Sequence, residues 1–246
     1  MKPLLRWLAL VALALLALQL LFVGRIAAMA VLNPESTAFQ RSEAWAQIAG
    51  PDRLRWHQQW VAYADISDHL KRAVITAEDD SFTQHEGIDW NAMEKAWERN
   101  AKAQAQAQAQ AARLQAKAPA APAAKVRGGS TITQQLAKNL LLSSERTLVR
   151  KGQELLLTLL LEKLLSKQRI LEIYLNNVEW GEGVFGAEAA AQHYFKKSAA
   201  HLAPTEAARL AVMLPAPKRF EKMPASAYLS GRTRVIAGRM RNAQLP

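Results

Sequence analysis

An apolar run at the amino terminus constrains this chain more than any other feature of its sequence. From Trp7 to Gly24 the only strongly polar residue is Gln19. These 18 residues would form a helix about 27 Å long, close to the hydrocarbon thickness of a bilayer. The sequence therefore predicts an uncleaved signal-anchor transmembrane helix over residues 1–30. A cleaved signal peptide and a buried soluble helix are the alternatives.

The charges beside this run predict its orientation. Lys2 and Arg6 lie at its amino end, whereas Arg25 follows it. Positive charges collect on the cytoplasmic side of membrane helices. We therefore expect the amino terminus inside the cell and the rest of the chain outside the cytoplasmic (inner) membrane, in the periplasm.

The chain is strongly basic and has no cysteine. Its formal net charge is +11 and its pI is about 10.1. A basic chain suits a polyanionic partner, which could be a nucleic acid, an anionic lipid or a phosphorylated substrate. The lack of cysteine excludes disulfides, thiolate metal sites and a thiol nucleophile.

Helical patterns dominate the rest of the chain and no run alternates as strands do, so we predict a mostly α fold. Residues 31–52 look like a connector, and residues 53–246 suffice for one domain with a sizeable core. The stretch 153–165 is apolar nearly all round, which predicts a buried central helix. Further helices are expected to begin near Ser67 and Asp89 and to cover residues 167–176, 187–195, 206–214 and 225–241, with Ser166 and Thr205 as caps.

Residues 101–124 differ in character from the rest. Ala and Gln alternate from Ala103 to Ala111, and Pro119 and Pro122 follow. This alternation gives no apolar face with either the helical or the strand period. We predict an insertion that begins as an exposed helix, passes into a flexible linker and carries no chemistry.

The first cluster of candidate catalytic residues runs from Glu78 to Asp89 and surrounds His85 with carboxylates. Glu78 ends an apolar helical pattern, so burial could raise its pKa and make it a better base. The alternative is a solvated acidic loop that caps helices, with His85 in a structural role. A zinc site is disfavoured because the second histidine of a zinc helix is missing.

A glycine-rich turn forms the second cluster. Gly128 and Gly129 precede Ser130 and Thr131, and Lys138 follows two helical turns later. Free backbone N–H groups at a helix start suit a phosphate or a sugar. The alternative is an ordinary helix capped by Ser or Thr, and the residue order excludes a Walker phosphate loop.

Basic residues around one carboxylate form the third cluster. Arg150 and Lys151 lie four and three residues before Glu154, so both can pair with it on one helix face, and Arg146 lies one turn earlier. A surface ion pair is the alternative. Glu154 opens the leucine-rich stretch, however, which predicts that it is half buried.

Taken in order, these clusters resemble the motifs of the family 51 peptidoglycan glycosyltransferases, over about residues 65–220. The chain is similar to the monofunctional biosynthetic peptidoglycan transglycosylases, because the Ser-x-x-Lys and Lys-Thr-Gly strings of the bifunctional penicillin-binding proteins are absent from it. The insertion at 101–124 is longer than the family usually has. The matching strings are Glu78-Asp-x-x-Phe82-x-x-His85-x-Gly87-x-Asp89, Gly128-Gly-Ser-Thr-x-Thr-Gln-Gln-x-x-Lys138-Asn139, Arg150-Lys-x-x-Glu154 and Ile170-Leu-Glu-x-Tyr-Leu-Asn176, with Ala207 to Pro217 similar to the last motif.

The resemblance implies a lysozyme-like glycosyltransferase domain with a smaller membrane-proximal lobe. It implies that the enzyme polymerises lipid II into β-1,4-linked glycan strands with inversion and releases undecaprenyl diphosphate. Glu78 would be the general base and Glu154 the second essential carboxylate. The substrate-binding residues that it implies are Asp79, Phe82, His85, Ser130, Thr131, Gln134, Gln135, Lys138, Asn139, Arg146, Arg150 and Lys151.

The implied partners are lipid II, the growing glycan strand and the membrane, with cell-wall synthesis or division proteins as further candidates. Nucleic acid is not expected, because no aromatic stacking ladder accompanies the basic residues near the carboxyl end. No cofactor follows with certainty, although a divalent cation, Mg²⁺ or Mn²⁺, assists some family members.

Two other functions remain as alternatives. A lytic transglycosylase or lysozyme-like hydrolase also uses one glutamate in a helical domain, but it needs no cations for a diphosphate. A membrane-tethered scaffold without catalysis would fit the basic tail helix.

Overall fold

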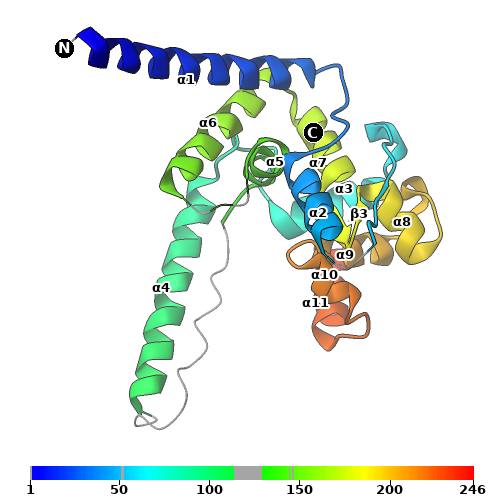
Figure 1. Cartoon of the computed structure of the whole chain (residues 1–246). Helices are drawn as coiled ribbons and strands as arrows, with labels where there is room; N and C mark the ends of the chain where they lie inside the picture. The colour runs from blue at the N-terminus through cyan, green and yellow to red at the C-terminus, as the bar shows by residue number, and fades with distance from the viewer. Residues whose placement is uncertain (1, 51–52, 114–128, 144, 146) are drawn as a thin grey trace.

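The computed structural model describes all residues except 1, 51–52, 114–128, 144 and 146. The described chain is mostly helical with a small sheet (Figure 1), which confirms the predicted fold class. The α-helices are α1 (Lys2–Ala28), α2 (Ala38–Ala49), α3 (Asp68–Glu78), α4 (Trp90–Arg113), α5 (Ile132–Leu141), α6 (Leu148–Leu164), α7 (Lys167–Asn177), α8 (Ala187–Phe195), α9 (Pro204–Met213), α10 (Pro217–Glu221) and α11 (Ala227–Arg239).

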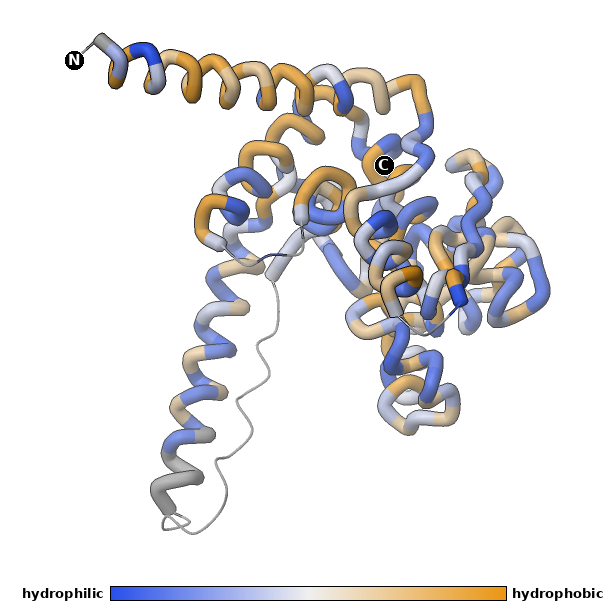
Figure 2. Tube along the Cα trace, viewed as in Figure 1, coloured by the Kyte–Doolittle hydropathy of each residue, from blue (hydrophilic) through white to orange (hydrophobic). Residues whose placement is uncertain are grey.

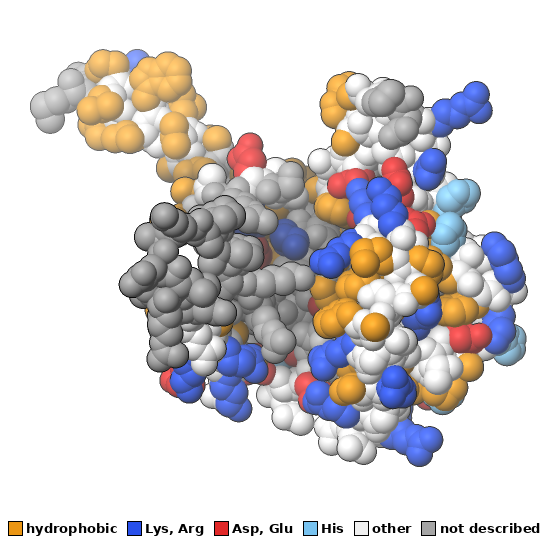
Figure 3. All heavy atoms as spheres, turned by 90° about the horizontal axis from the view of Figure 1, so that it is seen from below, with side chains coloured by type: hydrophobic (Ala, Val, Ile, Leu, Met, Phe, Trp, Pro, Cys, Tyr) orange, Lys and Arg blue, Asp and Glu red, His pale blue; other side chains and the backbone are white. Residues whose placement is uncertain are grey.

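Helix α1 projects from the body of the protein and is almost wholly hydrophobic (Figures 2 and 3). Its span from Pro3 to Ala28 is long and apolar enough to cross a membrane. The large apolar side chains between Leu4 and Leu21 are 43–68% exposed. That exposure overturns the alternative of a buried soluble helix and agrees with a membrane anchor.

The end of α1 is docked on the body rather than hinged to it. Ile26 and Met29 are buried in the core. The Arg169 guanidinium donates hydrogen bonds to the carbonyl oxygens of Met29 (2.8 Å) and Leu32 (2.9 Å), which closes the carboxyl end of the helix. These contacts fix where α1 leaves the body.

A helix lies inside the segment that the sequence predicted as a connector. α2 begins with a capping box between Thr37 and Gln40, both of which are fully buried. The Gln40 amide also donates to the Asn177 carbonyl (3.2 Å), and Lys218 pairs with Glu43 on the next turn. The helix was missed because its large apolar residues Trp45 and Ile48 are exposed and mark no buried face, and its stability comes from these distant partners.

The core lies where α3 packs against α9 and α11. Ser67 caps α3 as predicted, and α3 ends at Glu78. The sequence predicted that this helix begins after Thr205, but α9 begins at Pro204. Proline fits the first helical position because the N–H that it lacks has no partner there, and Glu206 bonds back to the Ala203 N–H (2.8 Å).

A three-stranded sheet was not predicted from the sequence. Its order is β1 (His57–Gln58), β3 (Val184–Phe185), β2 (Glu179–Gly181), with β1 parallel and β2 antiparallel to β3. Gly183 holds the turn with φ +72°, and a Cβ there would lie 2.2 Å from the Arg55 carbonyl oxygen. Strands of two or three residues are too short to show an alternating pattern.

Helix α6 is not the buried central helix that its leucines suggested. Leu157 and Leu161 are fully buried, but Leu155, Leu156 and Leu159 are 39–49% exposed. The helix contacts α5 and α1, and these leucines form an apolar face that neither helix covers. The sequence is apolar nearly all round because some of its leucines pack in the core and others are exposed on the surface of the helix.

Helix α4 begins as predicted after Asp89, whose carboxylate accepts the Ala92 N–H (2.7 Å). It continues into the Ala/Gln stretch as far as Arg113 and extends away from the body (Figure 1). The predicted flexible linker falls on residues 114–124, which lie outside the described residues. The first part of the insertion is therefore helical, in agreement with the sequence analysis.

Candidate active site

Glu78 lies at the end of α3 and faces α5. The Gln135 amide donates to Glu78 Oε2 (2.8 Å), and the Tyr174 hydroxyl donates to Gln135 Oε1 (3.0 Å). Burial raises the pKa of Glu78 and is the largest influence on it. The Gln135 hydrogen bond and the positive charge of Lys138 oppose that rise, and the charge of Asp79 adds to it. The result is an oriented carboxylate with raised basicity, which suits a general base.

Lys138 brings positive charge to the same place. It lies one helical turn after Gln135 on α5, and its side chain is exposed. Its field acts on Glu78, as the effect on the pKa of that carboxyl shows. A cation on this side could stabilise a leaving group that becomes negative opposite the base.

Glu154 holds two further cations near the start of α6. Its carboxylate is 3% exposed and accepts from Arg150 Nη1 (2.9 Å) and from Lys151 Nζ. Thr147 caps the helix by accepting the Arg150 N–H (3.1 Å). The predicted grouping of Arg150, Lys151 and Glu154 is therefore present, and burial makes it more than a surface ion pair.

A pocket of about 210 Å³ brings the cations of α5 and α6 together, because Lys138 and Arg150 both line it. Asn139, another predicted binding residue, lines it as well. Among the described residues, no acceptor bonds to the buried Arg150 Nε. A buried donor without a partner is rare in folded proteins, and this one belongs to a side chain that lines the pocket.

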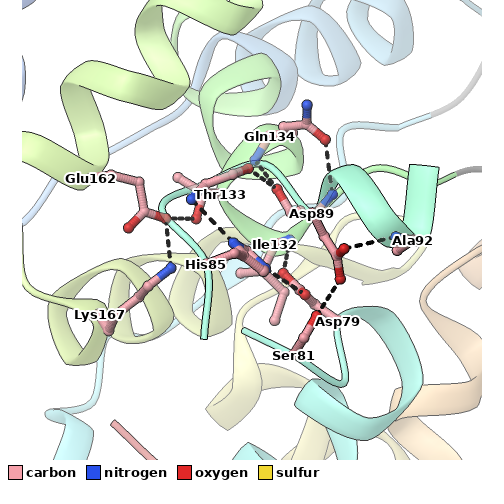
Figure 4. Close-up of polar contacts among 12 residues, drawn as sticks. Asp79, Ser81, His85, Asp89, Ala92, Ile132, Thr133, Gln134, Glu162 and Lys167 are labelled. Carbon is pink, nitrogen blue, oxygen red and sulfur yellow. Dashed lines mark hydrogen bonds and ion pairs between the residues drawn. The ribbon is translucent and has the colours of Figure 1, made fainter. Parts of the chain in front are cut away.

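Asp79 makes contacts within the protein that the sequence did not predict, and its role in substrate binding stays a prediction. Its side chain is 3% exposed, and its carboxylate contacts His85 Nε2 (2.9 Å) and accepts the Ile132 N–H (2.9 Å), as Figure 4 shows. At the start of α5 the Ile132 N–H is therefore bonded to a carboxylate and the Gln134 N–H to Thr131, so neither is free for a phosphate. The carboxylate of Asp79 lies 53 residues away in sequence, which is why the sequence pattern could not reveal this contact.

Four other predicted substrate-binding residues also belong to the scaffold. Thr131 and Gln134 form the capping box of α5, and Thr131 also donates to the Gly87 carbonyl (2.6 Å). Phe82 is fully buried, with Lys167 Nζ 4.5 Å from its ring centre. Phe82, His85, Thr131 and Gln134 each contact other parts of the protein, and their binding of a substrate stays a prediction.

Ser130 and Arg146 are the remaining predicted residues, and Tyr174 is a residue of the site that the sequence analysis did not single out. Ser130 is exposed beside the start of α5, whereas Arg146 lies outside the described residues. Tyr174 was not among the predicted site residues, yet its hydroxyl orients Gln135 and through it Glu78. The signal for this role was available, because a buried tyrosine hydroxyl needs a hydrogen-bond partner.

The described residues do not offer a ready site for Mg²⁺ or Mn²⁺. Asp79, His85 and Asp89 place ligand atoms within 4.8 Å of one another. Both oxygens of Asp79 are engaged, and Asp89 binds Ser81 and the start of α4 (Figure 4). These atoms already satisfy protein donors, whereas a hard cation needs several oxygens with free lone pairs.

Replacing Asp79 with alanine is expected to destabilise the fold by about 2–4 kcal/mol, because it leaves the buried Ile132 N–H and His85 without their acceptor. The melting temperature should fall by roughly 5–10 °C, measured by circular dichroism. Asp80 is the matched control, since its ion pair with Arg239 is more than half exposed on both sides. An unchanged melting temperature in Asp79→Ala would contradict the capping role.

Comparison with known proteins gives consistent matches over nearly the whole chain. A family model described as Transglycosylase matches residues 46–241. A protein of Paraburkholderia phytofirmans named biosynthetic peptidoglycan transglycosylase is 48% identical over 245 residues, which cover 98% of this chain and 94% of that protein. Proteins of the same name are 50% identical in Cupriavidus metallidurans (98% of this chain, 99% of that protein) and 47% identical in Herminiimonas arsenicoxydans (100% and 99%).

Proposed function

Because this chain belongs to the transglycosylase family, whose catalytic domain is lysozyme-like, we propose that its substrate is lipid II, the undecaprenyl-diphosphate-linked disaccharide of the cell wall. The chain is a peptidoglycan glycosyltransferase that builds glycan strands in cell wall synthesis. We further propose which residues act on the donor sugar and which act on the acceptor sugar during this reaction. It rests chiefly on one observation, the oriented and desolvated Glu78 carboxylate within the field of Lys138.

Glu78 acts as the general base in this proposal. The 4-hydroxyl of the acceptor sugar gives its proton to Glu78 while its oxygen attacks the anomeric carbon of the donor. The bond from that carbon to the diphosphate breaks, so the configuration inverts and a β-1,4 linkage forms. A hydroxyl is a weak nucleophile near neutral pH, and a positioned base accelerates such a step by about 10²–10⁴-fold.

The cations on α5 and α6 receive the departing diphosphate. Lys138 and Arg150 line one pocket, and Lys151 shares Glu154 with Arg150. Positive groups that are held before the reaction stabilise negative charge as it develops, without first having to reorganise. Glu154 is buried and holds Arg150 and Lys151 in position, so we assign it a positioning role rather than contact with the sugar.

The membrane supports this substrate assignment. α1 can cross a bilayer, and Gln19 exchanges two amide hydrogen bonds (3.1 Å each) with Gln153 of α6. The exposed leucines of α6 lie on the helix that contacts α1. We propose a single-pass anchor in the inner membrane with the catalytic domain on the periplasmic side, where cell-wall synthesis or division proteins are candidate partners.

Glycan cleavage, as in a lytic transglycosylase, is the less favoured activity. Cleavage would need Glu78 but would leave the cations of Lys138, Arg150 and Lys151 without a purpose. The exposed arginines of α11, Arg232 and Arg234, also agree with attraction to anionic lipid or substrate.

The test is a product assay with the full-length protein in detergent micelles. Fluorescently labelled lipid II should be converted into a ladder of glycan chains on a gel, and purified cell-wall sacculi should release no soluble fragments. Release of fragments without any polymer would reverse the assignment in favour of cleavage.

A further inference from the structure

The pocket beside the cations has a wall that belongs to neither α5 nor α6. It is formed by α2, the helix in the segment between the anchor and the catalytic domain. With about 210 Å³, the pocket is smaller than the 300–1,000 Å³ typical of sites that enclose a whole drug-sized ligand. It therefore suits one group of a larger substrate. Its lining residues are Ala38, Phe39, Ser42, Lys138, Asn139, Leu142, Ser143 and Arg150.

One part of the lining is polar and suits an anion. Lys138 and Arg150 supply positive charge, and the buried Arg150 Nε bonds to no acceptor within the described part of the chain. Ser42 and Ser143 add hydroxyl groups. Hydroxyls and cations together match the several oxygens of a diphosphate.

The other part of the lining is apolar. Ala38 and Phe39 of α2 and Leu142 at the end of α5 supply its apolar side chains. α2 follows the membrane anchor after nine residues, so this wall belongs to the end of the domain that adjoins α1. A ligand that fits both parts carries an anionic group joined directly to hydrocarbon, which excludes a nucleoside diphosphate because its next group is a polar ribose.

We propose that α2 is part of the substrate-binding site and recognises the junction between diphosphate and polyprenyl chain. Ser42 Oγ donates a hydrogen bond to a diphosphate oxygen, and Phe39 packs against the first isoprene unit. This inference rests on the proposed function, because it identifies which part of the lipid-linked substrate occupies the pocket.

The protein holds α2 rigidly enough for such a role. The Thr37–Gln40 capping box and the Gln40 contact with Asn177 fix its first turn. Lys218 reaches from α10 to Glu43 and lies 3.4 Å from Glu179, which ties the second turn to the sheet. A wall that is fixed before the substrate arrives loses little entropy on binding.

The experiment measures binding of farnesyl diphosphate to the full-length protein in micelles by isothermal titration calorimetry. Ser42→Leu, which fills the pocket, should weaken binding by about tenfold or more, and the smaller change Ser42→Ala by about three- to tenfold. Phe39→Ala should weaken farnesyl diphosphate but not inorganic diphosphate. Ala46→Leu is the matched control, because Ala46 is exposed one turn further along α2 and does not line the pocket.

Equal affinity in Ser42→Leu and the unchanged protein would overturn the proposal, and so would equal losses in Ser42→Leu and Ala46→Leu. Binding of farnesol as tight as that of farnesyl diphosphate would overturn the role of the anion.

Lipid II turnover is measured in parallel, and Ser42→Leu should raise KM more than it lowers kcat. Glycan synthesis with an unchanged KM in Ser42→Leu would refute only the α2 wall. Farnesyl diphosphate binding without any glycan synthesis by the unchanged protein would refute only the proposed function.

Discussion

Glu78→Gln is expected to lower the rate of lipid II polymerisation by about 10²–10⁴-fold, since it removes the proton acceptor and keeps the shape of the side chain. The glutamine oxygen can still accept the Gln135 amide hydrogen bond that orients position 78. The measurement is the initial rate of glycan formation from labelled lipid II. Asp80→Asn, at the exposed neighbouring carboxylate, is the matched control and should retain the rate.

The stability of Glu78→Gln should stay equal or rise while its rate falls. This difference separates a loss of catalysis from a loss of folding. Burial raises the pKa of Glu78 above its unfolded value of about 4.3, so the folded state binds this proton more tightly than the unfolded state. The ionised carboxylate therefore costs stability as the pH rises through the folded pKa, and the cost remains above it. Glu78→Gln removes that cost, and its melting temperature at pH 7 should be equal to or higher than that of the unchanged protein.

The pH profile gives a further readout of the same carboxylate. The rate should fall as the pH drops through the raised pKa of Glu78, because a protonated base cannot accept the proton of the hydroxyl. The acid limb of kcat/KM should thus lie above the range of an ordinary glutamate. Full activity in Glu78→Gln, or an acid limb at or below about pH 4.3, would remove Glu78 from the role of base.

Glu154→Gln is expected to lower polymerisation by about 100-fold through misplacement of the cations, with a loss of about 1–3 kcal/mol in stability. Its carboxylate is nearly inaccessible and holds Arg150 and Lys151, so neutralising it leaves two like charges without their shared partner. The measurement combines lipid II turnover with thermal unfolding.

Glu162 provides the control that this variant needs. It lies two turns later on α6, its side chain is 9% exposed, and it pairs with Lys167 (2.9 Å) away from the cation cluster. Glu162→Gln should cause a similar loss of stability and retain most of the activity. If both variants lost activity equally, Glu154 would be a purely structural residue.

Local patterns in the sequence predicted much of the helical framework. Ser67 and Ser166 each cap a helix as expected, and α8 covers the predicted residues 187–195. Such signals are readable because a cap bonds to N–H groups two or three residues away. The pairing of Arg150 and Lys151 with Glu154 was readable for the same reason, since all three residues lie within two turns of one helix.

The sequence by itself determined the apolar amino-terminal helix, the mostly helical fold and the order of charged residues, because each depends on residues close together in the chain. Only the tertiary structure decided which of those residues are buried and which groups they contact. Asp79 reaches the start of α5 across 53 residues, and Gln135 reaches Glu78 across 57, so burial and hydrogen bonding at these positions have no local signature. The same reason explains α2, whose place beside Lys138 and Arg150 depends on packing between distant segments rather than on its own composition.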